Sequence, residues 1–215
     1  MTREILTRAL DYSPAEGIFV AWTGGKDSTV ALDLWNNFLI ETRPDLGVRA
    51  LNLDTGYKFP EVLHFRDEVA RERGIDLRVI RPDKKELEMA ERASKVECCR
   101  KLKVNPLQDA ITQHCVQGLV TGIRRDEHPS RENTREIQEK DAGYIQINPI
   151  AHWTEMDIWS YTVLHGLRYC SLYDRGYRSL GCAPCTFRDS EPGERTGRDR
   201  EKEESLEYLR SLGYF

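Results

Sequence analysis

The chain has 215 residues, which is enough for one α/β domain with a sizeable hydrophobic core. Hydrophobic residues (39%) and charged residues (32%) stand in the proportion of ordinary soluble proteins, which argues against a disordered or membrane-embedded chain. The net charge of −4 argues against a broad, non-specific nucleic-acid surface. No apolar run approaches the roughly 18 residues of a membrane span, and the first residues lack a signal-peptide pattern, so we expect a cytoplasmic protein without membrane contact.

Strand and helix patterns alternate along the first two thirds of the chain. The predicted strands cover residues 18–22, 48–53, 77–80, 119–121 and 144–147. The predicted helices cover residues 2–12, 28–40, 60–73 and 105–115. This alternation is typical of a doubly wound α/β fold with a mostly parallel five-stranded sheet and helices on both faces. In such sheets, ligands bind beyond the carboxyl ends of the strands.

The pattern changes after Pro149. We expect a helix over 155–165, a loop rich in Gly, Tyr and Cys up to residue 188, and a charged helix over 198–212 with a thin leucine stripe. We therefore divide the chain into an α/β core (1–150) and a C-terminal extension (151–215) that are integrated into one domain.

The segment Thr23-Gly24-Gly25-Lys26-Asp27-Ser28 joins the first strand to its helix. Adjacent glycines allow a tight turn with exposed N–H groups, and the helix directs its positive dipole end to the same place. The lysine adds a positive charge and the serine adds a hydroxyl. The segment therefore predicts an anion cradle of phosphate size. It is not the common phosphate loop, which has four residues between its first glycine and the Gly-Lys pair.

Two further segments follow strands and are expected at the same edge of the sheet. Asp54 and Thr55 follow the second strand, where a carboxylate can meet a ribose hydroxyl or a bound Mg²⁺, although Asp-Thr-Gly also commonly begins a simple turn. The other segment follows the strand at 119–121, and its arginines could hold phosphate or sulfate oxygens or form an ordinary solvated charge run. Its candidate residues are Gly122, Arg124, Arg125 and Arg131.

Four of the six cysteines form two groups, Cys98-Cys99 and Cys182-Ala183-Pro184-Cys185. Four thiolates can hold either zinc or an iron–sulfur cluster. Adjacent cysteines fit zinc poorly, because zinc ligands are usually separated by two to four residues. Free thiols are the third alternative.

These segments carry a family resemblance. Thr23 to Ser28 resembles the Ser-Gly-Gly-Lys-Asp-Ser loop of the ATP pyrophosphatase (PP-loop) superfamily, whose members cleave ATP between the α and β phosphates. The stretches after Asp54 and Gly122 resemble the PAPS reductase family, and the cysteine pattern resembles the [4Fe–4S] site of bacterial-type APS reductases. The similarity runs from about residue 17 to 187. It implies a [4Fe–4S] cluster on Cys98, Cys99, Cys182 and Cys185.

Two departures from the reductases decide the expected function. Those enzymes end in a Glu-Cys-Gly-Leu-His tail with a catalytic cysteine, whereas this sequence has no cysteine after Cys185. In those enzymes the loop that corresponds to residues 23–28 lacks the lysine, whereas Lys26 is present here and implies that the nucleotide is ATP. We therefore expect an ATP pyrophosphatase that adenylates an acceptor for sulfur transfer, in DNA phosphorothioation or a related thiolation.

In this interpretation Lys26, Asp27, Arg124 and Arg125 are catalytic. ATP with Mg²⁺ is bound by the loop from Thr23 to Ser28 together with Asp54, Thr55, Gly122 and Arg131. A sulfur donor such as a cysteine desulfurase is the expected partner, with nucleic acid as a candidate acceptor and a homodimer as a candidate assembly. Three alternatives stay open: an APS or PAPS reductase that uses thioredoxin, a sulfate-adenylating enzyme like the ATP sulfurylase small subunit, and a nucleotide sensor without turnover.

Overall fold

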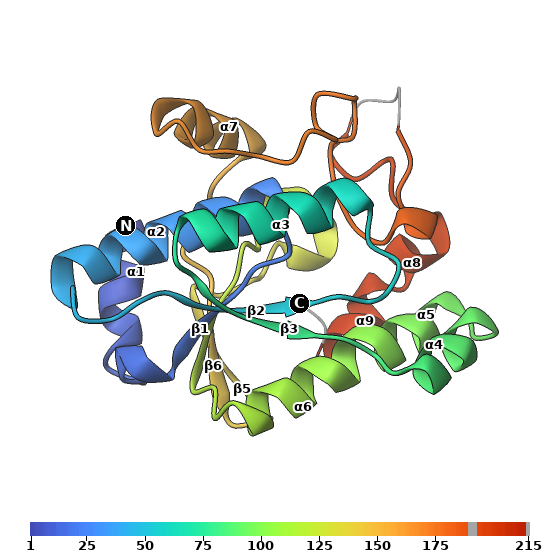
Figure 1. Ribbon diagram of the computed structural model, residues 1–215, viewed down its shortest axis with the longest axis horizontal. Coiled ribbons are helices and arrows are strands. Elements are labelled where there is room, and N and C mark those ends of the chain that lie inside the picture. Colours follow the sequence, from blue (N-terminus) through green and yellow to red (C-terminus); the bar gives the residue numbers. More distant parts are fainter. Residues whose placement is uncertain (189–192, 214–215) are drawn as a thin grey trace.

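The buried strand β1 (Ile18–Ala21) lies in the interior of a six-stranded sheet in the computed structural model, which describes residues 1–188 and 193–213 (Figure 1). The strand order is β3-β2-β1-β4-β6-β5. All neighbouring pairs are parallel except β5 and β6. The remaining strands are β2 (Arg49–Leu53), β3 (Asp76–Ile80), β4 (Gly118–Val120), β5 (Ile137–Lys140) and β6 (Tyr144–Ile147).

The predicted α/β class is confirmed, and the predicted number of strands is one too low. The additional strand, β5, lies at the edge of the sheet and reads Ile-Gln-Glu-Lys. An edge strand buries little of its surface, so its sequence lacks the apolar run that marks the central strands.

Helices cover both faces of the sheet (Figure 1). Alternate residues of β1 point to opposite faces, so Ile18 and Val20 belong to one hydrophobic cluster while Phe19 and Ala21 belong to the other. The first cluster includes side chains of α1 (Thr2–Ala9), α2 (Lys26–Thr42) and α3 (Pro60–Glu72). The second is completed by α6 (Asn105–Gln113).

Shorter helices surround this core. They are α4 (Lys84–Glu91), α5 (Lys95–Cys99), which continues into a π-helical turn over Arg100–Val104, α7 (Glu155–Leu164), α8 (Arg200–Glu204) and α9 (Leu206–Ser211). The charged helix expected over 198–212 is thus divided at Ser205, and α4 and α5 were not predicted. Within residues 1–188 and 193–213, no helix combines the length and the apolar character that a membrane crossing requires.

The order of the strands determines where loops converge. From β1 the chain moves to β2 and β3 on one side, and later to β4 and β6 on the other. The carboxyl ends of β1 and β4 therefore flank the point at which the strand order reverses, which is where open α/β sheets bind ligands. The loop 22–25 and the loop that begins at Thr121 both start there.

Candidate functional site

A pocket opens beyond the carboxyl ends of β1, β2 and β4. The space that it encloses together with its open mouth is about 1110 Å³. One part of the lining is apolar and suits a flat ring such as a base; it is formed by Ala21, Leu51, Leu53, Leu107 and Ile123.

Another part of the lining is strongly cationic. Five basic side chains line the pocket, against two acidic ones, Asp27 and Glu127. The basic residues are Lys58, Lys103, Arg131, Arg195 and Arg198. Gly181, which precedes Cys182, also lines the pocket, and its missing side chain leaves room for the Arg198 guanidinium. A ligand with an apolar ring and an anionic tail matches this distribution.

The loop after β1 is held in a fixed shape by its own hydroxyl groups. The Ser28 hydroxyl oxygen lies 3.0 Å from the Thr23 hydroxyl oxygen and accepts a bond from the Thr23 backbone N–H at 3.2 Å. Gly24 has a φ of +83°, which a residue with a side chain rarely adopts. The backbone N–H of Lys26, the first residue of α2, donates to the Tyr173 hydroxyl at 2.8 Å. Thr23, Gly25, Asp27 and Ser28 line the pocket.

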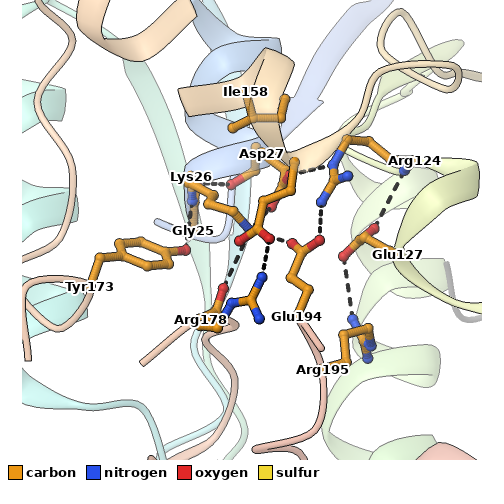
Figure 2. A network of polar contacts seen from close by, with 12 residues as sticks. Gly25, Lys26, Asp27, Arg124, Glu127, Ile158, Tyr173, Arg178, Glu194 and Arg195 are labelled. Carbon is orange, nitrogen blue, oxygen red and sulfur yellow. Dashed lines mark hydrogen bonds and ion pairs between the residues drawn. The ribbon is translucent and has the colours of Figure 1, made fainter. Parts of the chain in front are cut away.

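Lys26 and Arg124 do not line the pocket but lie beside it in a network of charges (Figure 2). Asp27 bonds both of them, at 3.1 Å to Lys26 Nζ and 2.7 Å to Arg124 Nε. The carboxylate of Glu194 also bonds both. Burial favours the neutral amine, but the negative charges of Asp27 and Glu194 hold the pKa of Lys26 above its ordinary value.

Glu127 extends the same network. Its carboxylate pairs with Arg131 and lies 3.4 Å from Arg195 (Figure 2). Burial would raise the pKa of Glu127, but Arg131 and Arg195 lower it to about 2, so the group is ionised at neutral pH. This carboxylate positions two of the basic side chains that line the pocket.

Two predicted site residues contact other parts of the protein and do not line the pocket. Asp54, a candidate Mg²⁺ ligand, is buried and pairs with Arg81 at 3.1 Å and Arg66 at 3.5 Å, and it does not line the pocket. Arg125 donates to the backbone oxygen of Thr134 at 2.9 Å and also lies outside the pocket lining. Thr55, Gly122 and Arg131 line the pocket as expected.

The two groups of cysteines lie near each other, since Cys99, Cys182 and Cys185 all act electrostatically on Cys98. Cys98 and Cys99 lie at the end of α5, and residues 182–185 are attached to the segment after Asp54 by a bond from the Ala183 N–H to the Tyr57 oxygen at 2.7 Å. Burial raises the pKa of the Cys98 thiol, and Cys99 and Cys182 raise it further. Burial has the same effect on Cys182, but Lys103 and Lys58 lower its pKa to about 6 and so favour the thiolate.

The cysteine sulfurs are not arranged as a tetrahedral zinc site. Among the described residues, no three cysteine sulfurs lie within 4.8 Å of one another. Tetrahedral zinc with Zn–S bonds of about 2.3 Å would hold its sulfurs about 3.8 Å apart. Four thiolates are also the donor set that holds an iron–sulfur cluster.

The comparisons with known proteins agree with this arrangement. Residues 17–188 match the model of the phosphoadenosine phosphosulfate reductase domain. The chain belongs to this family. An adenosine 5′-phosphosulfate reductase of Mycolicibacterium smegmatis is 38% identical over 180 residues, which are 77% of this chain and 75% of that protein.

Two solved structures show the fold shared with the family and its neighbours. A phosphoadenylyl-sulfate reductase from Candida auris superposes with a TM-score of 0.67 at 22% identity, covering 85% of this chain and 88% of that one. The U34-tRNA thiolase NcsA from Methanococcus maripaludis, determined with its [4Fe–4S] cluster, gives a TM-score of 0.59 at 14% identity over 100% of this chain and 79% of that one.

The predicted main function is wrong. The relative that is 38% identical is an adenosine 5′-phosphosulfate reductase, and relatives at 35% and 36% identity carry the same name. These findings favour the reductase alternative over an ATP pyrophosphatase for DNA phosphorothioation. One of the two grounds for that prediction was Lys26, whose presence suggested a bound triphosphate; in the structure its ammonium group bonds carboxylates of this chain.

Sequence reasoning also missed several residues of the site. Tyr173 and Glu194 contact Lys26 from positions 147 and 168 residues away, and no local pattern indicates such distant contacts. The basic residues Arg195 and Arg198 lie beyond the part that matches the family model. A Gly-Glu-Arg-Thr-Gly-Arg run next to a charged helix reads as a solvated surface.

Proposed function

We propose that this chain is a sulfonucleotide reductase that converts adenosine 5′-phosphosulfate into AMP and sulfite. The observation that supports this proposal is one pocket with an apolar part and five basic side chains, directly beside the cysteine loop at Gly181. The relatives named as reductases of this nucleotide support the same substrate. The apolar part would take the adenine, and the cationic part would take the phosphosulfate.

The basic residues would act by neutralising charge. Adenosine 5′-phosphosulfate carries negative charge on its phosphate and its sulfate, and AMP leaves with a further negative charge on the phosphate oxygen. Positive side chains that are already fixed in place stabilise this developing charge without reorganisation. Arg131, held by Glu127, and Arg198, packed on Gly181, are two groups of this kind.

The reaction needs two thiols. A thiolate attacks the sulfate sulfur, the S–O bond to the AMP phosphate breaks, and the bonding electron pair leaves with AMP. The product is a thiol-bound sulfonate. A second thiolate attacks the thiol sulfur, which releases sulfite and forms a disulfide. We assign both thiols to a dithiol protein of the thioredoxin class, so that this dithiol is oxidised by two electrons while the sulfur is reduced by two.

We further propose that Cys98, Cys99, Cys182 and Cys185 hold a [4Fe–4S] cluster. The four side chains fit this group in donor type and in their nearness, since all four are free thiols and Cys98 lies within electrostatic reach of the other three. When bound, the cluster would supply a centre of redox-active iron beside the cationic part of the pocket. Lys103 and Lys58 would stabilise its thiolates.

An assay of sulfite formation tests the proposed function. The anaerobically purified protein is given adenosine 5′-phosphosulfate and reduced thioredoxin, and we expect sulfite to accumulate. Arg198→Gln should lower kcat/KM by about 10- to 150-fold, because a charge-assisted hydrogen bond contributes about 1.5–3 kcal/mol. Arg200→Gln is the matched control, because this arginine is 93% exposed and pairs only with Glu204 among the described contacts. Absence of sulfite, or an equal effect of both substitutions, would contradict the proposal.

A further inference from the structure

Glu194 occupies an unusual position at the start of α2. Its carboxylate bridges Lys26 Nζ and Arg124, and the three side chains are almost completely buried (Figure 2). Their exposed fractions are 1% for Lys26, 0% for Arg124 and 8% for Glu194. A carboxylate that joins two buried cations takes the place that an oxyanion of a ligand would otherwise take.

Lys26 has no donor left for a ligand in this arrangement. Its ammonium group donates to Asp27 at 3.1 Å, to the backbone oxygen of Arg178 at 3.3 Å, and to Glu194. An ammonium group has three N–H donors, so these acceptors use all of them. One N–H group of the helix N-terminus is also used, because the Lys26 backbone N–H donates to the Tyr173 hydroxyl.

The positive charges at this end of the site are already paired. Carboxylate oxygens of Asp27, Glu127 and Glu194 lie within 4.8 Å of one another. They form ion pairs with Lys26, Arg124, Arg131 and Arg195. A nucleotide tail that extended toward Lys26 and Arg124 would have to displace Glu194 from both cations, and a cost of this kind against an unwanted ligand is a common source of specificity.

We propose that Glu194 is a specificity-determining residue that excludes triphosphates. Its carboxylate occupies the Lys26–Arg124 anion site, so the pocket accepts a nucleotide with a short tail, such as adenosine 5′-phosphosulfate, and rejects ATP. This inference rests on the proposed function for the identity of the accepted nucleotide. The exclusion of ATP is a separate property that can be measured without turnover.

Binding measurements with two probes, AMP and ATP with Mg²⁺, test the inference. In the wild type we expect ATP to bind no better than AMP. Glu194→Gln keeps the shape of the side chain but removes its charge, and should strengthen ATP binding about tenfold, equivalent to about 1.4 kcal/mol, while AMP binding changes less than about threefold. The double variant Glu194→Gln with Lys26→Met should lose this gain in ATP affinity. The gain depends on the Lys26 ammonium group, which the Glu194 substitution frees from its ion pair.

Asp126→Asn is the matched control. Asp126 also pairs with Arg124, at 3.2 Å, but it is half exposed and has no contact with Lys26 among the described residues. It should change the affinities for AMP and ATP by similar factors. AMP binding shows that each variant has a folded pocket, and Glu194→Ala replaces Glu194→Gln if the latter does not bind AMP.

Two results would overturn the inference. One is tight binding of ATP by the wild type. The other is that Glu194→Gln and Glu194→Ala each change the affinity for ATP by the same factor as the affinity for AMP. Neither result depends on sulfite formation. A protein that fails to form sulfite but shows the predicted ATP gain would contradict the proposed function and support the role of Glu194.

Discussion

At the scale of single residues, Gly122 is where the two loops of the site meet. A Cβ at this position would lie 2.6 Å from the Ser28 backbone nitrogen and 2.7 Å from the carbonyl carbon of Asp27. Both atoms belong to the backbone at the start of α2, so neither can turn away as a flexible side chain could. The close approach of β4 and the loop after β1 therefore requires glycine.

We expect Gly122→Ala to displace the loop after β1. Overpacking of this kind costs about 1–3 kcal/mol of unfolding free energy, and the displaced loop should weaken AMP binding about tenfold or more. Chemical denaturation and AMP titration measure the two effects. Gly47→Ala is the control, because a Cβ there has no neighbour within 4 Å. Unchanged AMP affinity in Gly122→Ala would show that the loops do not need this approach.

At the scale of elements, α5 and the loop at 182–185 bring the cysteines together. Two contacts fix the loop. One is the antiparallel β-bridge between Lys58 and Cys182, which includes the Ala183 N–H bond to the Tyr57 oxygen. The other is the bond from the Asp199 N–H to the Cys185 oxygen at 3.1 Å; Asp199, the N-cap of α8, also pairs with Lys95 of α5 at 3.3 Å. The loop lacks regular structure apart from a short turn, so its position depends on these contacts.

The proposed cluster predicts a measurable iron content. Anaerobically purified wild type should contain about four iron and four sulfide ions per chain and show broad visible absorbance. Cys182→Ser should lose most of the iron and the absorbance, because one of four ligands is removed. Cys115→Ser is the matched control, since Cys115 is exposed and lies after α6, outside both cysteine groups. One zinc per chain in place of iron would contradict the assignment.

Elements with strong periodic patterns were predictable from the sequence. The strands β1, β2, β4 and β6 and the helices α2, α3 and α6 bury clear apolar faces, and their predicted ranges agree with the structure within about two residues. The helices α4 and α5 were missed because they are short and mostly polar; α4, for example, fully buries only Ala90. Their positions depend on tertiary contacts that single-sequence patterns do not contain.

At the scale of the whole molecule, the strand order explains why distant motifs share one pocket. Reversal of the order at β1 places the loops after β1 and β4 side by side, and β2 carries Thr55 to the same edge. These were predictable, because each motif follows a strand. The segment 193–204, which adds Glu194, Arg195 and Arg198, was not predictable, because tertiary contacts place it at the site: ion pairs of Glu194 and Arg195, and a β-bridge between Thr186 and Arg198.

The role of Lys26 shows the limit of reading motifs. The residues of the loop from Thr23 to Ser28 are intact, and its backbone forms the expected turn before α2. Its lysine charge is nevertheless balanced by Asp27 and Glu194. A motif determines local geometry, whereas the charge that a ligand meets is a sum over residues from the entire chain.

The most direct test of the central claim is a balance of products with both nucleotides present. Wild-type protein is incubated anaerobically with equal concentrations of adenosine 5′-phosphosulfate and ATP, together with reduced thioredoxin, and AMP, sulfite and pyrophosphate are quantified from the same samples. If the pocket serves a sulfonucleotide reductase, sulfite will form in the same amount as AMP and no pyrophosphate will appear. AMP that is matched by pyrophosphate, without sulfite, would contradict the account.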